Sequence, residues 1–141
     1  MTQVSRFPLS KALKEEMNLL FLRSFAMLRS ETDVQDLLED LLTPNERIML
    51  GKRLAIAYLL DKGLNQRDVH TIMKVSVSTV SGVNYWLTHR GTGYKNVLRL
   101  LKRNEEWRDF LEKLDKTLYE TFSVKALYRR AYGHMPNPDH S

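Results

Sequence analysis

The chain has 141 residues, of which 43% are hydrophobic and 28% charged, a composition typical of one globular domain rather than of a disordered segment. It contains no cysteine, which excludes disulfides, thiolate zinc sites and a cysteine nucleophile, and no apolar run approaches the roughly 20 residues that span a bilayer. The formal net charge of +5 is too small to indicate a partner by itself. We expect a soluble, cytoplasmic protein without a signal peptide.

Hydrophobic residues recur at helical spacing along nearly the whole chain, which predicts an all-α fold. We expect the first helix over about 9–29. Its hydrophobic stripe is wider than one packed face needs, and in so short a chain a second subunit is the simplest cover for it. A second helix is expected over about 33–42.

The third helix has the clearest start signal in the chain. Thr43 is suited to the N-cap, Pro44 to the first helical position and Glu46 to the capping-box position. Gly63 is a typical residue just past a helix end. The sequence therefore predicts a helix from Pro44 to about Lys62.

Shorter helices are expected in the rest of the chain, separated by capping residues and glycines. The predicted ranges are about 66–73, 77–88, 94–102, 104–118 and 124–132, with a turn at Arg90-Gly91-Thr92-Gly93. We expect residues 103–132 to form a C-terminal helical extension and residues 133–141 to form a flexible tail.

The positive charge is concentrated in the middle of the chain. Residues 62–103 contain eight basic side chains and one acidic side chain, a net charge of +7. Residues 1–61 contain eight basic and nine acidic side chains, and residues 104–141 contain six and seven. Such a local excess is expected where a polyanion binds.

The same basic segment has the layout of a helix-turn-helix motif. Two short helices that cross steeply share a very small core, and Val69, Met73, Val80 and Val83 are spaced to provide it, with Val75 in the turn. A polar helical hairpin without a ligand would show the same pattern. The coincidence with the basic segment favours a DNA-binding motif over about 66–88.

The outer face of the second helix of this motif is predicted to enter the DNA major groove. Its side chains near the N-terminal end are small or polar, so base edges could approach, and basic side chains beside them would contact phosphates. The predicted DNA-binding residues are Gln66, Arg67, Lys74, Ser76, Val77, Ser78, Thr79, Ser81, Gly82, Arg90 and Lys95.

Three stretches of the sequence resemble a known family. Residues 42–57 (LTPNERIMLGKRLAIA) resemble the signature of the Trp repressor family, and residues 75–81 (VSVSTVS) and 91–95 (GTGYK) are similar to its YerC/YecD-type branch. The resemblance implies a Trp-repressor-like helical bundle over about 1–102, assembled as an intertwined homodimer. It also implies a repressor-like transcriptional regulator that binds double-stranded operator DNA with two recognition helices.

The resemblance further implies the place of an effector pocket. In the Trp repressor the corepressor lies between two arginines; the first matches Arg53 here, whereas the second falls on Gly82 and a small serine of the site falls on Trp86. Thr43 is retained. We therefore expect a vestigial pocket that does not sense L-tryptophan. Trp86 either fills the vacated space or is a core or dimer-interface aromatic residue.

Other residue patterns indicate no catalytic or metal site. The four histidines lack metal-ligand spacing, and no nucleophile with a base and an orienting group is visible, so we expect neither an enzyme nor a cofactor. The sequence does not indicate a small-molecule effector. The alternative function is a protein-interaction module that recruits a partner through the C-terminal aromatic residues Trp107, Phe110, Tyr128 and Tyr132.

Overall fold

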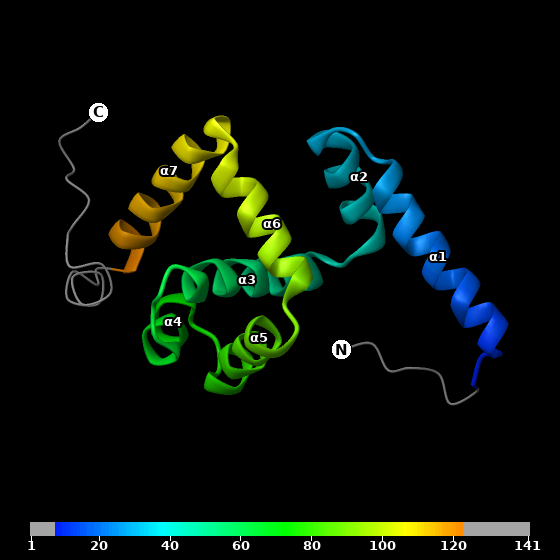
Figure 1. Ribbon diagram of the computed structural model, residues 1–141, viewed down its shortest axis with the longest axis horizontal. Coiled ribbons are helices and arrows are strands. Elements are labelled where there is room, and N and C mark those ends of the chain that lie inside the picture. Colours follow the sequence, from blue (N-terminus) through cyan, green and yellow to red (C-terminus); the bar gives the residue numbers. More distant parts are fainter. Residues whose placement is uncertain (1–7, 123–141) are drawn as a thin grey trace. The chain divides into compact units, whose positions relative to one another are not determined.

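The structure is a computed structural model that describes residues 8–122, with side chains described through Leu118. The described residues form seven α-helices and no strand, which confirms the all-α prediction (Figure 1). The chain divides into two compact units, Met1–Arg47 and Ile48–Ser141. The helix predicted over 124–132 and the tail predicted over 133–141 lie outside the described residues.

The first unit contains α1 (Lys11–Met27), α2 (Glu31–Leu41) and the start of α3. Ser10 and Ser30 cap α1 and α2, since each hydroxyl accepts a hydrogen bond from the backbone N–H three residues later. The observed bounds of α1 and α2 differ by up to two residues from the predicted ranges 9–29 and 33–42.

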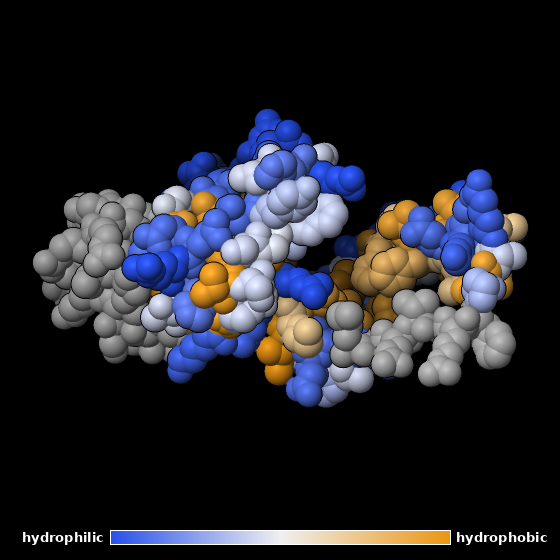
Figure 2. Space-filling model, turned by 90° about the horizontal axis from the view of Figure 1, so that it is seen from below, coloured by the Kyte–Doolittle hydropathy of each residue, from blue (hydrophilic) through white to orange (hydrophobic). Residues whose placement is uncertain are grey.

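Neither α1 nor α2 has a buried residue, although both carry hydrophobic side chains. Leu20 is 70% exposed, and Met17, Leu19, Phe21, Leu22 and Met27 are exposed as well. Figure 2 shows hydrophobic surface on the part of the molecule formed by these helices. The chain alone therefore leaves the stripe of α1 uncovered, as its width in the sequence predicts.

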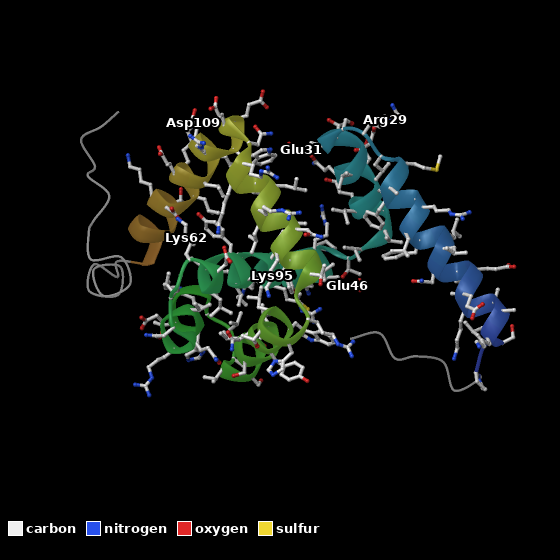
Figure 3. The ribbon with its side chains drawn as sticks, viewed as in Figure 1. Arg29, Glu31, Glu46, Lys62, Lys95 and Asp109 are labelled. Carbon is white, nitrogen blue, oxygen red and sulfur yellow. The ribbon has the colours of Figure 1, made fainter. Side chains whose placement is uncertain are left out.

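The third helix, α3 (Pro44–Asp61), begins with the predicted capping box. The Glu46 N–H donates to the Thr43 hydroxyl at 3.2 Å, and the Thr43 N–H donates to the Glu46 carboxylate at 3.0 Å. The bond from the Thr43 N–H to the carboxylate is the larger cause that holds the pKa of the Glu46 carboxyl below its usual value, and the Thr43 side chain is the second. Figure 3 marks Glu46 at the start of this helix.

The lowered pKa of Glu46 predicts a change in stability with pH. A carboxyl whose pKa is lower in the folded than in the unfolded state stabilises the fold above the unfolded value, and this contribution is lost as the pH falls through the folded value. We expect thermal melts to show wild type losing more stability than Glu46→Gln between about pH 5 and pH 3. Glutamine keeps the acceptor for Thr43 but does not titrate. Parallel loss in both proteins would contradict this.

Within the second unit, the end of α3 leads into α4 through a glycine turn. Gly63 has φ of +100°, its N–H donates to Leu60 O, and the Leu64 N–H donates to Leu59 O. This is the 6→1 and 5→2 pattern that ends helices on a left-handed glycine. Leu64 is buried directly after it, which anchors the linker to the core.

The pair α4 (Gln66–Met73) and α5 (Val77–His89) packs below α3 in Figure 1. Asn65 and Ser76 cap the two helices. The predicted inner residues are confirmed: Val69, Val80 and Val83 are buried, and Met73 and Val75 pack against the same cluster. Ile72 and Leu87 are buried there as well, and the sequence analysis did not include them.

The predicted start of the next helix at Tyr94 is wrong. Helix α6 (Thr92–Arg103) begins two residues earlier, so Thr92 and Gly93 are helical and not part of a turn. The turn is shorter because Gly91 adopts φ of +49° and serves as the N-cap. A Cβ at Gly91 would lie 2.7 Å from Leu87 O, so the backbone of α5 passes close to this glycine.

The last described helix, α7 (Glu105–Phe122), starts at the Asn104 cap and returns alongside α6 toward the end of α3 (Figure 1). Its Leu118 is buried in the core of the second unit, and Leu111 and Leu114 pack against that core. None of the described helices is long and apolar enough to cross a bilayer.

Candidate nucleic-acid interface

The exposed face of α5 carries the small and polar side chains that the sequence places there. Ser78, Ser81 and Gly82 are exposed, and Val77 is 55% exposed at the first turn. Tyr85, also 55% exposed, continues this face and stacks on His89 with ring centroids 4.3 Å apart. The N-terminal half of this face therefore carries small and polar side chains, and its C-terminal half carries aromatic ones.

A hydrogen bond joins the two helices of the pair across this surface. The Ser81 hydroxyl of α5 donates to the side-chain oxygen of Gln66 at the start of α4, at 3.0 Å. The Gln66 amide nitrogen, with its two N–H donors, takes no part in this bond. Both residues are predicted DNA contacts, and no local pattern in the sequence indicates that they bind each other.

The hydroxyl groups at the start of α5 form a second cluster. The Ser76 hydroxyl accepts from the Thr79 N–H at 3.2 Å and lies 3.0 Å from the Ser78 hydroxyl and 2.8 Å from the Thr79 hydroxyl. Ser76 therefore acts as the helix cap, and Thr79 is half-buried beside it. Ser78 is exposed and does not serve as the helix cap, so its hydroxyl is accessible to a ligand atom.

The basic residues predicted to contact phosphates are exposed around this surface. Arg67 lies on α4, Lys74 in the turn and Arg90 after α5. Lys95 lies in the first turn of α6 (Figure 3). Lys74 has φ of +52°, and within residues 8–122 it is the one non-glycine residue in this conformation. Its left-handed backbone lets the chain reverse between the two helices.

The structure shows which charged side chains of the basic segment, residues 62–103, are buried and which form ion pairs. Its one acid, Asp68, is 3% exposed, so its carboxylate does not lie among the basic side chains at the surface. Two of its lysines are paired with acids from outside the segment, Lys62 with Asp115 and Lys102 with Asp61. The six basic residues that form no ion pair with a described residue are Arg67, Lys74, Arg90, Lys95, Arg99 and Arg103.

A pocket of about 980 Å³ lies between α3, α5 and α6, beside the exposed face of α5. Three of the residues predicted for the effector pocket, Arg53, Gly82 and Trp86, line it together. A Cβ at Gly82 would meet no atom within 4 Å, so the space beside the glycine is open. Trp86 is 48% exposed and forms a wall of the pocket, so it is not a core residue of this chain.

Arg90 also lines this pocket, which the sequence analysis did not predict. Its guanidinium carbon lies 5.3 Å from the centre of the Trp86 ring, a cation–π contact between residues four apart. The i, i+4 spacing on a helix was the sequence signal for this pair. Thr43, the remaining predicted pocket residue, lies in the first unit as the cap of α3.

The C-terminal aromatic residues are partly described. Trp107 and Phe110 of α7 form an edge-to-face pair with centroids 5.2 Å apart, and Phe110 is exposed. Tyr128 and Tyr132 lie outside the described residues. Within residues 8–122, no group of three His, Cys, Asp or Glu side chains is arranged to hold a metal ion.

Comparison with known proteins points to one family. The model of the Trp repressor protein family matches residues 16–102, which include α4, α5 and nearly all of α6. A Trp operon repressor homolog from Mannheimia succiniciproducens is 34% identical over 102 residues, which cover 72% of this chain and 85% of that protein. No solved structure matches the chain. The chain belongs to the Trp repressor family.

Proposed function

We propose that this protein is a sequence-specific DNA-binding transcriptional regulator of the repressor type that acts as a homodimer and does not respond to tryptophan. Membership of the Trp repressor family supports the DNA-binding, regulatory part of this proposal. The match does not distinguish branches of the family, so the YerC/YecD-type assignment is part of the proposal.

The observation that carries the proposal is the composition of the exposed α4–α5 surface. Small and polar side chains at the start of α5 leave room for base edges, and Arg67, Lys74 and Lys95 are exposed around them without a described acidic partner. A helix presented in this way is suited to the major groove.

The dimer is proposed from the first unit. Since α1 and α2 have no buried residue, their hydrophobic side chains need a cover that the chain alone does not provide. A second copy would supply it and would place two α5 helices on one DNA duplex. The predicted operator would then contain two half-sites separated by about one helical turn, or 10–10.5 base pairs.

Selection of bound sequences from a random DNA library tests this function, followed by anisotropy titrations of the selected fragment at several salt concentrations. We expect a repeated half-site in the selected sequences and an affinity that falls steeply with salt. No enrichment of any sequence, with weak binding to all fragments, would contradict the proposal. That outcome would favour a role of this protein in recruiting another protein.

Lys74→Gly is predicted to stabilise the protein and to weaken DNA binding. Lys74 has φ of +52°, where glycine avoids the steric cost of a Cβ, so we expect the free energy of unfolding to rise by about 0.5–1 kcal/mol. Loss of one phosphate contact should reduce the salt slope of binding by about one unit. Urea denaturation and anisotropy titrations measure the two effects.

Lys74→Asn is a second variant that removes the same charge, and asparagine also tolerates the left-handed conformation. Both variants should show the same reduced salt slope. An unchanged slope in both would mean that Lys74 does not contact a phosphate.

We expect calorimetry to show no saturable binding of L-tryptophan. The position of the second arginine is Gly82, which supplies no guanidinium, and the nearby Arg90 is held against the Trp86 ring. Absence of one charge-assisted contact costs about 1.5–3 kcal/mol, or on the order of tenfold to a hundredfold in affinity. DNA titrations of the same sample confirm that it is active. Tight binding of one tryptophan per chain would contradict this part of the proposal.

A further inference from the structure

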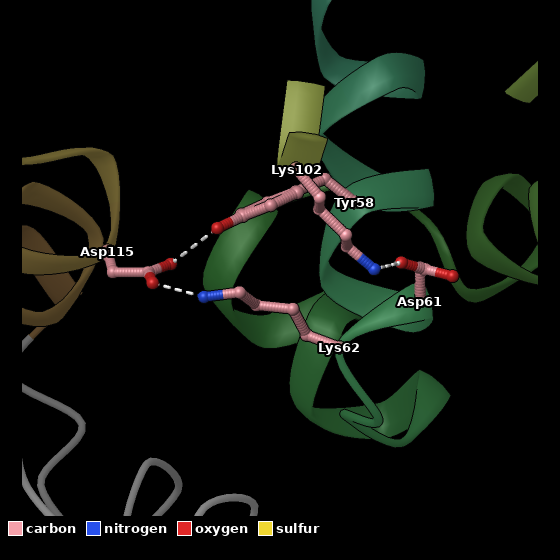
Figure 4. A network of polar contacts seen from close by, with 5 residues as sticks. All are labelled: Tyr58, Asp61, Lys62, Lys102 and Asp115. Atoms are coloured by element: carbon pink, nitrogen blue, oxygen red, sulfur yellow. Dashed lines mark hydrogen bonds and ion pairs between the residues drawn. The ribbon is translucent and has the colours of Figure 1, made fainter. Parts of the chain in front are cut away.

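The C-terminal end of α3 is held by side chains from outside the part of the chain that the family model covers. The match ends at residue 102, and α7 begins at Glu105. Asp115 of α7 accepts a hydrogen bond from the Tyr58 hydroxyl at 3.1 Å and forms an ion pair with Lys62 (Figure 4). Tyr58 lies on α3, and Lys62 directly follows its last residue.

The three side chains form one compact cluster. Lys62 lies over the Tyr58 ring, with its ammonium nitrogen 5.0 Å from the ring centre, and both donate to the same carboxylate. The Lys62 and Asp115 side chains are 24% and 18% exposed, so water screens this pair less than an ordinary surface ion pair. Lys102 and Asp61 form a second ion pair beside it, from α6 to the last residue of α3 (Figure 4).

This cluster lies at the start of the linker to α4. The linker comprises residues 62–65, and it contains the left-handed Gly63 and the buried Leu64. The direction of the last turn of α3 therefore decides where α4 and α5 begin. On the other side of the linker, Leu118 of α7 belongs to the same core cluster as Val69 and Val80 of the α4–α5 pair.

We propose that Asp115 is a positioning residue: by fixing Tyr58 and Lys62, it couples the C-terminal helix α7 to the orientation of the α4–α5 pair. This inference rests on the proposed DNA-binding function for its consequence. A dimer that reads two half-sites binds best when both α4–α5 pairs are already oriented, because ordering them on contact lowers affinity. In this chain α7 holds the α4–α5 pair in its orientation without a ligand.

The sign of the effect on DNA binding separates this role from simple electrostatics. Removing a carboxylate raises the net charge by one, which by itself strengthens attraction to phosphates. A positioning role of Asp115 predicts weaker DNA binding when the carboxylate is removed. We expect Asp115→Ala to bind the selected operator about fivefold to tenfold more weakly than wild type, with an unchanged salt slope, because no phosphate contact is lost.

Asp115→Asn provides a graded test that is nearly isosteric. Asparagine keeps an acceptor for the Tyr58 hydroxyl but loses the ion pair with Lys62, so its affinity should lie between those of wild type and Asp115→Ala. Asp109→Ala is the matched control. It removes the same charge from an exposed position near the start of α7, away from Lys62, and should bind at least as tightly as wild type (Figure 3).

Amide hydrogen exchange provides a readout that does not depend on DNA. In Asp115→Ala, exchange in α4 and α5 should become faster than in Asp109→Ala, while exchange in α1 and α2 should not change.

The inference is overturned if both alanine variants exchange alike in α4 and α5, or if wild type binds its operator and Asp115→Ala binds it as tightly. If wild type binds no DNA selectively, the proposed function fails, and hydrogen exchange still decides the coupling. Should Asp115→Ala not fold, Asp115→Asn decides by the same two measurements.

Discussion

Replacing Leu20 by glutamate is expected to dissociate the proposed dimer and to weaken operator binding by on the order of a hundredfold or more. Leu20 is 70% exposed in a helix that has no buried residue, so its change cannot disturb a core within the chain. In the dimer it would lie in the interface, where an unpaired carboxylate loses its hydration.

The loss of DNA affinity follows from the loss of linkage between two binding sites. When two α4–α5 pairs belong to one dimer, the second binds at a high effective concentration after the first. A monomer has no such gain. Analytical ultracentrifugation measures the assembly state, and anisotropy titrations of an operator with two half-sites measure the affinity.

Asn18→Glu is the matched control for Leu20→Glu. It makes the same change in charge on α1 at an exposed polar residue, so a purely electrostatic repulsion of DNA would weaken both variants equally. We expect Asn18→Glu to remain dimeric and to lose little affinity. If Leu20→Glu stays dimeric and binds the operator like wild type, then α1 is not the dimer interface.

Gly91→Ala is expected to lower the free energy of unfolding by roughly 2–4 kcal/mol. Gly91 has φ of +49°, and a Cβ there would lie 2.7 Å from Leu87 O and 2.8 Å from Leu87 Cα. These are backbone atoms of α5, which cannot move without displacing the helix. The displacement would also shift α6 and Lys95, so operator affinity should fall together with stability.

Gly93→Ala should have the opposite effect, although it lies two residues away. Gly93 is within α6, and a Cβ there would meet no atom within 4 Å. Alanine should raise the free energy of unfolding by about 0.5–1 kcal/mol, because it is the better helix former. Urea denaturation of both variants measures the difference. Equal effects of the two substitutions would contradict the assignment of Gly91 as the left-handed N-cap of α6.

The elements whose signals are local could be predicted from the sequence. The capping box of Thr43 and Glu46 and the caps Asn65 and Ser76 each involve atoms within three residues along the chain, and all are present in the structure. The inner residues of α4 and α5 followed from hydrophobic spacing in the same way. The family resemblance, carried by residues in these same elements, is confirmed by the comparisons.

The candidate interface could be predicted less completely. Exposure of Arg67, Lys74 and Lys95 agreed with the sequence analysis, since polar residues opposite a hydrophobic stripe face solvent. Their role in DNA binding stays a prediction. Arg90 was predicted as a phosphate contact, and the structure adds that it lies against Trp86 in the pocket, a pairing that depends on the side-chain directions of one helix.

The sequence by itself therefore determined the all-α class, the caps of α3, α4 and α5, and the basic segment, because each depends on residues close together in the chain. The tertiary structure decided which charges of that segment remain unpaired, since Asp115 reaches Lys62 across 53 residues and Lys102 reaches Asp61 across 41. It also decided that Gly91, and not Gly93, makes the turn into α6. Both outcomes depend on how separate helices pack, which the local pattern of residues does not specify.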